Sequence, residues 1–183
     1  MTSSGPRSRL HGLPLPVVIS LALLLPAGPI GLLVSGGHRA ERPPSQTLAQ
    51  VARSAGCRLR EFEDGMRTNP PVTGRFIERI RASDGSYVGR RPPSALGTIH
   101  AMMHGRVLLQ YGPDLRAGEL RRLERLVMAD PEGVLLFENQ TGMPERVAAT
   151  AYQSILTCPG VNRSTLRALA TFRARRGAFG QAF

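Results

Sequence analysis

The chain has 183 residues, which allows one folded domain with a tail or an anchor but too little sequence for two hydrophobic cores. Its formal net charge is +11, and all 24 basic residues are arginine, as is typical of a GC-rich bacterium. The arginines are scattered and form no basic stripe with interleaved aromatic residues, which argues against nucleic acid as a partner. The net positive charge favours an anionic membrane surface instead.

The N-terminal segment of the chain predicts a membrane anchor. Residues 1–12 form a basic tail, and residues 13–34 carry no charge over a length that suffices to cross a hydrocarbon core, for which about 20 apolar residues are needed. Pro26 and Pro29 would kink or end a helix, so the segment also resembles a signal peptide. No Ala-x-Ala cleavage site follows the apolar segment, which favours an uncleaved transmembrane helix. The alternative is a secreted protein released by signal cleavage.

After the anchor, residues 35–47 are rich in Gly, Pro, Ser and charge, which is typical of a linker, and residues 48–183 form the predicted domain. Two cysteines in this domain indicate on which side of the membrane it lies. Cys57 and Cys158, about 100 residues apart behind an export segment, predict a structural disulfide and hence a domain outside the cytoplasm. The alternative is two free buried thiols in a cytosolic domain.

Hydrophobic period and turn residues predict the elements of the domain. A short helix covers residues 48–54, and residues 66–99, rich in Pro and Gly, are expected to be loops with short strands. There follow a strand at 106–111, a helix at 117–129 capped by Asp114, a strand at 133–139, a third strand at 146–158, and a last helix capped by Asn162 or Ser164. This strand-helix-strand-strand-helix order predicts an α+β fold with a small mixed sheet, and a thioredoxin-like sandwich is the alternative.

Four motifs in order carry a family resemblance: "NPPVTG" (69–74), "GSYVG" (85–89), "IHAMMHGRVLLQY" (99–111) and "ATAYQSILTC" (149–158). Together they resemble the bacterial family called domain of unknown function 3105, over about residues 55–176. The resemblance implies one N-terminal transmembrane helix and an outward-facing domain, and it assigns no activity.

This chain departs from the family pattern at three positions. The pattern has His, Glu and Trp where this chain has Phe76, Met103 and Tyr152. If the polar residues of the family form a centre, this chain keeps His100 and His104 and lacks two of their partners.

The segment "HAMMHG" is the main candidate for a site. On a helix, His100 and His104 would lie one above the other and could point at one ion. Met103 offers a thioether that suits Cu(I) alongside imidazole. A zinc ion would need a third and usually a fourth ligand, for which Asp84, Glu138 and His38 are the candidates, although none lies at a characteristic spacing.

A simpler interpretation needs no metal. The histidines would bond to the backbone in a turn that leads into a strand, and the methionines would fill the core. Acid–base catalysis needs a second positioned group, which the sequence does not offer, so an enzyme is not expected. The predicted function is a membrane-anchored, extracytoplasmic module of the bacterial envelope with a non-catalytic binding or structural role and no cofactor. The alternative is a copper-binding protein that uses His100, His104 and Met103.

Overall fold

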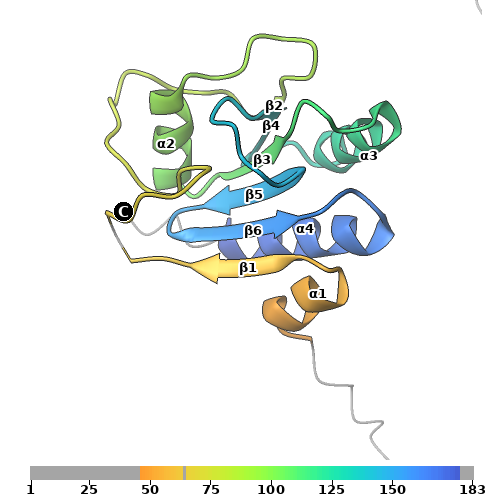
Figure 1. The fold of residues 1–183 in the computed structure, drawn as a ribbon. Coiled ribbons are helices and arrows are strands. Elements are labelled where there is room, and N and C mark those ends of the chain that lie inside the picture. Colours follow the sequence, from red (N-terminus) through yellow and green to blue (C-terminus); the bar gives the residue numbers. More distant parts are fainter. Residues whose placement is uncertain (1–45, 64, 178–183) are drawn as a thin grey trace, which may run out of the picture. The chain divides into compact units, whose positions relative to one another are not determined.

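A computed structural model describes residues 46–63 and 65–177, so the predicted tail and anchor (1–34) and most of the linker lie outside the described residues. Figure 1 shows the elements along the chain. They are α1 (Leu48–Ser54), β1 (Arg58–Glu61), β2 (Gly85–Ser86), α2 (Ala95–Met103), β3 (Val107–Tyr111), α3 (Ala117–Met128), β4 (Val134–Glu138), β5 (Val147–Ala151), β6 (Ser154–Cys158) and α4 (Arg163–Arg176). Within these ranges, no helix has the length and apolar character needed to span a bilayer.

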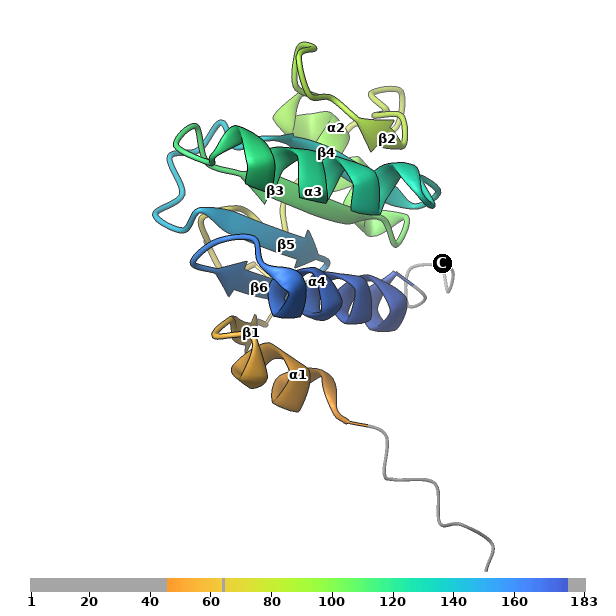
Figure 2. The ribbon, with the colours of Figure 1, turned by 90° about the vertical axis from the view of Figure 1, so that its right-hand side faces the viewer.

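A single mixed sheet organises the domain, with the strand order β1-β6-β5-β3-β4-β2. β2, β4 and β3 run parallel to one another, whereas β5, β6 and β1 continue the sheet in antiparallel pairs. In Figure 2, α3 and α4 lie on one face of the sheet and α2 lies on the other. The predicted α+β class with a mixed sheet is confirmed.

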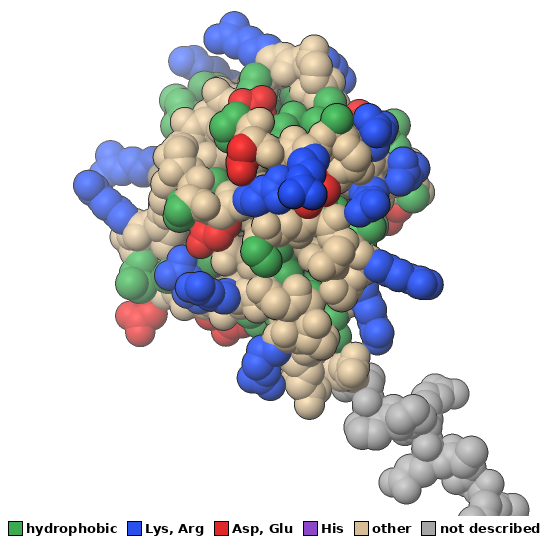
Figure 3. Space-filling model, turned by 45° about the vertical axis from the view of Figure 1, so that its right-hand side comes forward, with side chains coloured by type: hydrophobic (Ala, Val, Ile, Leu, Met, Phe, Trp, Pro, Cys, Tyr) green, Lys and Arg blue, Asp and Glu red, His purple; other side chains and the backbone are tan. Residues whose placement is uncertain are grey.

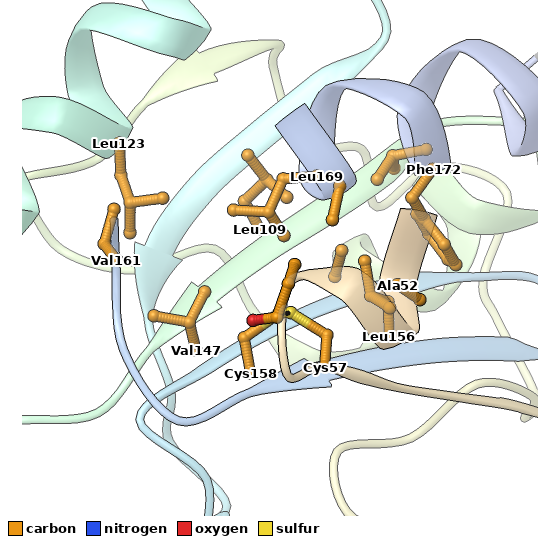
Figure 4. Close-up of a cluster of buried hydrophobic side chains, with 14 of the residues drawn as sticks. Ala52, Cys57, Leu109, Leu123, Val147, Leu156, Cys158, Val161, Leu169 and Phe172 are labelled. Carbon is orange, nitrogen blue, oxygen red and sulfur yellow. Dashed lines mark hydrogen bonds between the residues drawn. A yellow bond between two sulfur atoms is a disulfide. The ribbon is translucent and has the colours of Figure 1, made fainter. Parts of the chain in front are cut away.

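Both faces of the sheet are covered, which explains the continuous apolar runs of its central strands. Alternate residues of β3 serve the two sides, because Leu109 packs in the main cluster with α3 and α4, while Leu108 packs with α2. In Figure 4, Leu109, Leu156 and Phe172 belong to the main cluster, which also contains the two cysteines. The core is therefore built on both sides of β3 to β6.

The predicted disulfide is present and buried. Cys57 and Cys158 are joined with 4.4 Å between their Cα atoms, and they are 4% and 1% exposed. Figure 4 shows the bridge among the buried side chains of the main cluster. Cys57 precedes β1 and Cys158 ends β6, and these two strands pair. The bridge therefore fastens the edge strand and α1 to the C-terminal hairpin.

Two predicted elements are wrong in their boundaries. The third strand predicted at 146–158 is a hairpin, β5 and β6, which turns at Tyr152 and Gln153. The turn was missed because Gln153 adopts a φ of 58°, where glycine is the usual signal. The segment predicted as loops up to residue 99 contains the start of α2, whose N-cap Ser94 accepts a hydrogen bond from the Gly97 amide at 3.2 Å.

The predicted helix caps divide into one confirmed and one wrong. Asn162 caps α4 by accepting from the Thr165 amide at 2.9 Å, as expected. Asp114 does not cap α3, because the helix begins at Ala117 and its N-cap is Arg116, which makes no side-chain hydrogen bond as a cap. The Asp114 carboxylate instead pairs with Arg146 at 3.3 Å.

Glu119, in the first turn of α3, connects three elements. Its carboxylate accepts from the Val161 amide at 2.9 Å, before α4, and from Arg146 Nη2 at 3.1 Å, before β5. The hydrogen bond from Val161 holds the pKa of the Glu119 carboxyl below its ordinary value. Burial opposes this effect, and the charge of Arg146 adds to it. Glu119 thus favours its ionised form in the folded chain.

The lowered pKa of Glu119 predicts a pH-dependent stability. The pKa of Glu119 is lower in the folded chain than in the unfolded chain. Its ionised carboxylate therefore stabilises the fold fully at a pH above the unfolded-state pKa, and this stabilisation is lost as the pH falls through the folded-state pKa. We expect Glu119→Gln to lower the free energy of unfolding at pH 7 and to flatten its decline between about pH 5 and pH 3. Urea unfolding across this range is the measurement, with exposed Glu132→Gln as the control. An unchanged decline in Glu119→Gln would contradict this account of Glu119.

Candidate ligand-binding site

α2 carries both histidines of the "HAMMHG" segment. His100 lies in its last full turn and is only 2% exposed, whereas His104 forms the C-cap and is exposed. The helix ends there because Gly105 adopts a φ of 74°, the left-handed conformation common after a helix C-terminus. Met102 is buried against the sheet and belongs to the core, while Met103 is partly exposed.

The hydrogen bonds of the two rings define their orientation. His100 Nδ1 lies 2.9 Å from the Ile80 carbonyl, and because a carbonyl only accepts, this nitrogen carries the proton. His100 Nε2 therefore has a free lone pair when the ring is neutral, and His104 Nε2 lies 2.9 Å from it. Two neutral rings then share one N–H···N hydrogen bond in which His104 is the donor.

Phe76 covers the other side of His100. The two rings are stacked, with centroids 4.9 Å apart and an interplanar angle of 26°. The segment that carries Phe76 and Ile80 therefore packs across α2 and holds the His100 ring from two directions. This packing explains how a polar ring is buried without losing its hydrogen bonds.

A cavity of about 140 Å³ opens beside the pair. Four of the six residues that line it bear side-chain nitrogen, and none is acidic. They are Arg81, Ala82, His100, Ala101, His104 and Arg106. His104 and Arg106 also line a neighbouring hollow of about 360 Å³, in which Asp84, Asp130, Glu132 and Arg173 supply further charge.

Arg106 is fixed at the border of the two hollows. Its Nε lies 2.5 Å from Asp84 Oδ1, and Asp84 Oδ2 accepts from the Gly133 amide at 2.9 Å. Asp84 thus joins the end of α2 to the start of β4. The carboxylate serves as an anchor for Arg106 and is not among the residues that line the 140 Å³ cavity.

The histidine pair supplies two of the features that a metal site needs. The facing Nε2 atoms would have to move from 2.9 Å to about 3.3 Å to bind one zinc ion tetrahedrally, since zinc–nitrogen bonds are about 2.0–2.1 Å long. The bond from His100 Nδ1 to a carbonyl is the support that metal-ligating histidines commonly have. Across residues 46–63 and 65–177, however, no group of three or more His, Cys, Asp and Glu side chains could hold a metal ion.

The further ligands considered from the sequence do not join the pair. Asp84 is bound to Arg106, and Glu138 is an exposed residue at the end of β4. His38 lies outside the described residues. Met103 is next to His104 in α2 but does not line the cavity.

Sequence reasoning missed the two arginines of the cavity. Arg106 directly follows the "HAMMHG" segment, so its position next to the histidines was a usable signal. Arg81 comes from an irregular loop with no hydrophobic period, and only the fold brings it to α2.

Comparison with family models gives one result. A family described as Protein of unknown function (DUF3105) matches residues 66–178. The chain belongs to this family. The matched region of DUF3105 contains α2, the cavity and Cys158, but it begins after Cys57. Searches of curated proteins and of solved structures found no match.

The three positions at which the sequence departs from the expected family pattern fall in different places. Phe76 stacks on His100, so this position does border the histidine pair. Met103 lies beside His104 in the helix, and Tyr152 lies in the turn between β5 and β6. Two of the three departures are therefore next to the candidate site.

Proposed function

We propose that the chain is a membrane-anchored module of the bacterial envelope, whose domain lies outside the cytoplasm and binds a ligand without transforming it. The observation that carries the proposal is the buried bridge between Cys57 and Cys158, because structural disulfides persist in oxidising compartments. The uncharged segment at residues 13–34 supports it, since its length suits an anchor.

Two features favour binding over catalysis. Both ring nitrogens of His100 already have partners, Ile80 and His104, so this buried ring acts as a positioned wall of the cavity. Both thiols are consumed in the buried bridge, which leaves no thiolate for redox chemistry in the described domain.

The charge distribution supports a membrane-associated module without a nucleic-acid partner. On the face drawn in Figure 3, arginine side chains stand at separate places, and acidic side chains lie close to several of them. Nucleic-acid binding usually needs a continuous basic patch. The net charge of +11 still favours an anionic lipid surface as a partner.

We also propose that the domain has a thioredoxin-like fold. The unit β3-α3-β4, with its two strands parallel, is followed by the β5-β6 hairpin and α4, and helices cover both faces of the sheet. This connectivity supports a thioredoxin-like sandwich. Residues 112–116 connect β3 to α3 and contain no cysteine, which favours a binding role over thiol chemistry for such a fold.

The thiol state in living cells tests the proposed location. The full chain is expressed in a bacterium, the cells are quenched in acid, and free thiols are alkylated before mass spectrometry without reduction. We expect one linked peptide that contains Cys57 and Cys158. Two alkylated cysteines in the acid-quenched sample would refute an extracytoplasmic domain.

A second candidate function is binding of a soft metal ion. The facing Nε2 atoms of His100 and His104 favour it, and the thioether of Met103 is the nearest soft donor in the sequence. Histidine and thioether together suit Cu(I) better than zinc.

Copper binding predicts a specific variant effect. We expect the full chain to take up Cu(I), to bind zinc poorly, and to lose at least about tenfold in Cu(I) affinity in the Met103→Ala, His104→Ala double variant. Competition against a Cu(I) chelator is the measurement, and exposed Met128→Ala is the control. Uptake that is absent, or equal in all variants, removes this candidate.

A further inference from the structure

The 140 Å³ cavity has a chemical character that goes beyond a general binding role. Its polar lining comes from two arginines and two histidines, and its apolar lining comes from Ala82 and Ala101. At about 140 Å³, the cavity has room for one small polar group.

Both arginines keep N–H donors that no other residue of the described chain uses. Arg81 makes no hydrogen bond or ion pair with any residue in the described part of the chain. Arg106 uses its Nε for Asp84, and its two terminal nitrogens make no hydrogen bond to residues 46–63 or 65–177. Planar guanidinium groups with free N–H donors bind carboxylate and phosphate oxygens strongly.

The surrounding structure positions one of the two arginines in advance. Asp84, itself held by the Gly133 amide, fixes the guanidinium of Arg106, and the Ile80 carbonyl fixes the histidine wall. Ordering Arg106 on binding therefore costs little additional entropy, whereas the exposed side chain of Arg81 is ordered by the ligand itself.

One feature of the cavity opposes an anion. The C-terminus of α2 lies at His104 and carries about half a negative charge. Its last carbonyls, however, accept hydrogen bonds from the amides of residues 104–106. Among the groups that line the cavity or bond directly to its lining, the two guanidinium charges exceed this half charge together with the carboxylate of Asp84, so the balance over these groups is positive.

We infer that the cavity binds a single oxyanion, either a carboxylate or a phosphate group, through Arg81 and Arg106. The inference rests on the proposed binding function and names the ligand class of that site. His100, His104 and the two alanines shape the cavity, while the two arginines make the charged contacts.

The test compares two arginines of the same loop. Arg81 lines the cavity and Arg79 does not, and both are exposed, so Arg81→Gln and Arg79→Gln remove one charge each from neighbouring surface positions. The full chain in detergent is titrated calorimetrically at constant ionic strength with inorganic phosphate, with acetate, and with chloride as the control ion. We expect saturable binding of phosphate or acetate, whichever group the site is built for, and at least about a tenfold weakening in Arg81→Gln alone.

The outcomes separate this inference from the proposed function. Equal weakening in both variants, or the same response to chloride, means nonspecific charge screening and overturns the oxyanion site. Absence of binding by both phosphate and acetate overturns it as well. In either case a bridged Cys57–Cys158 pair in cells leaves the extracytoplasmic module in place, whereas two free thiols refute that location whatever the titration shows.

Discussion

Removal of the disulfide, in a Cys57→Ala, Cys158→Ala double variant, should lower the free energy of unfolding by about 4–5 kcal/mol. The two cysteines are 101 residues apart, and the chain-entropy treatment gives about this value for a loop of that size, because the bridge restricts the unfolded chain. Alanine avoids burying a hydroxyl at two positions of 4% and 1% exposure. Urea unfolding of the full chain in detergent measures the change.

The single variants provide the control for this prediction. Cys57→Ala or Cys158→Ala alone already removes the bridge, so each should be nearly as unstable as the double variant. The slope of the unfolding free energy against urea should also rise, because the unbridged chain exposes more surface when unfolded. A loss below about 1 kcal/mol in all three variants would show that the bridge does not stabilise this domain.

Asn139→Ala should produce the second large effect, a loss of about 3 kcal/mol. Asn139 is 7% exposed at the end of β4, and its side-chain amide donates to Gln110 Oε1 at 2.7 Å. Its Oδ1 accepts from the Thr141 amide at 2.9 Å and from the Met143 amide at 3.1 Å. Alanine leaves a buried acceptor and two backbone donors without their partner, at about 1–3 kcal/mol for each one that water does not reach.

The same network holds the "NPPVTG" segment in place. Asn69 Nδ2 donates to the Thr141 carbonyl at 3.0 Å, so this segment is attached to the turn that Asn139 organises. Gln140→Ala is the control, because Gln140 is exposed and should change stability by less than about 0.5 kcal/mol. Equal effects of Asn139→Ala and Gln140→Ala in urea unfolding would contradict the network.

Sequence patterns predicted the elements that have a strong period or distinct ends. α1 matches the predicted helix at 48–54, and β3 and β4 match bounded apolar runs to within a residue or two. α3 was predicted because its Leu123 and Val127 recur on one face of an otherwise charged helix. These features depend on local sequence alone.

The elements that were missed lack such local signals. α2 is short, contains Gly97, and is apolar on most sides, because it packs both on the sheet and under a loop. In the β5-β6 turn, Gln153 adopts a left-handed conformation, which is usually indicated in a sequence by glycine. Tertiary packing determines both, and a single sequence contains little of that information.

Only the part of the candidate site that depends on local sequence was predicted. His100 and His104 lie on one helix, so their spacing was informative. Arg81 reaches the cavity from a loop, and Phe76 meets His100 only in the folded chain. The histidine pair was therefore predictable from the sequence, whereas its cationic surroundings were not.

The central claim is that the domain lies outside the cytoplasmic membrane, and protease accessibility tests it most directly. The full chain is expressed in a bacterium, spheroplasts are prepared, and protease is added before and after lysis, with a cytosolic protein as the control for integrity. We expect residues 35–183 to be digested in intact spheroplasts while the control protein survives. Survival of residues 35–183 until lysis, followed by their digestion, would contradict it.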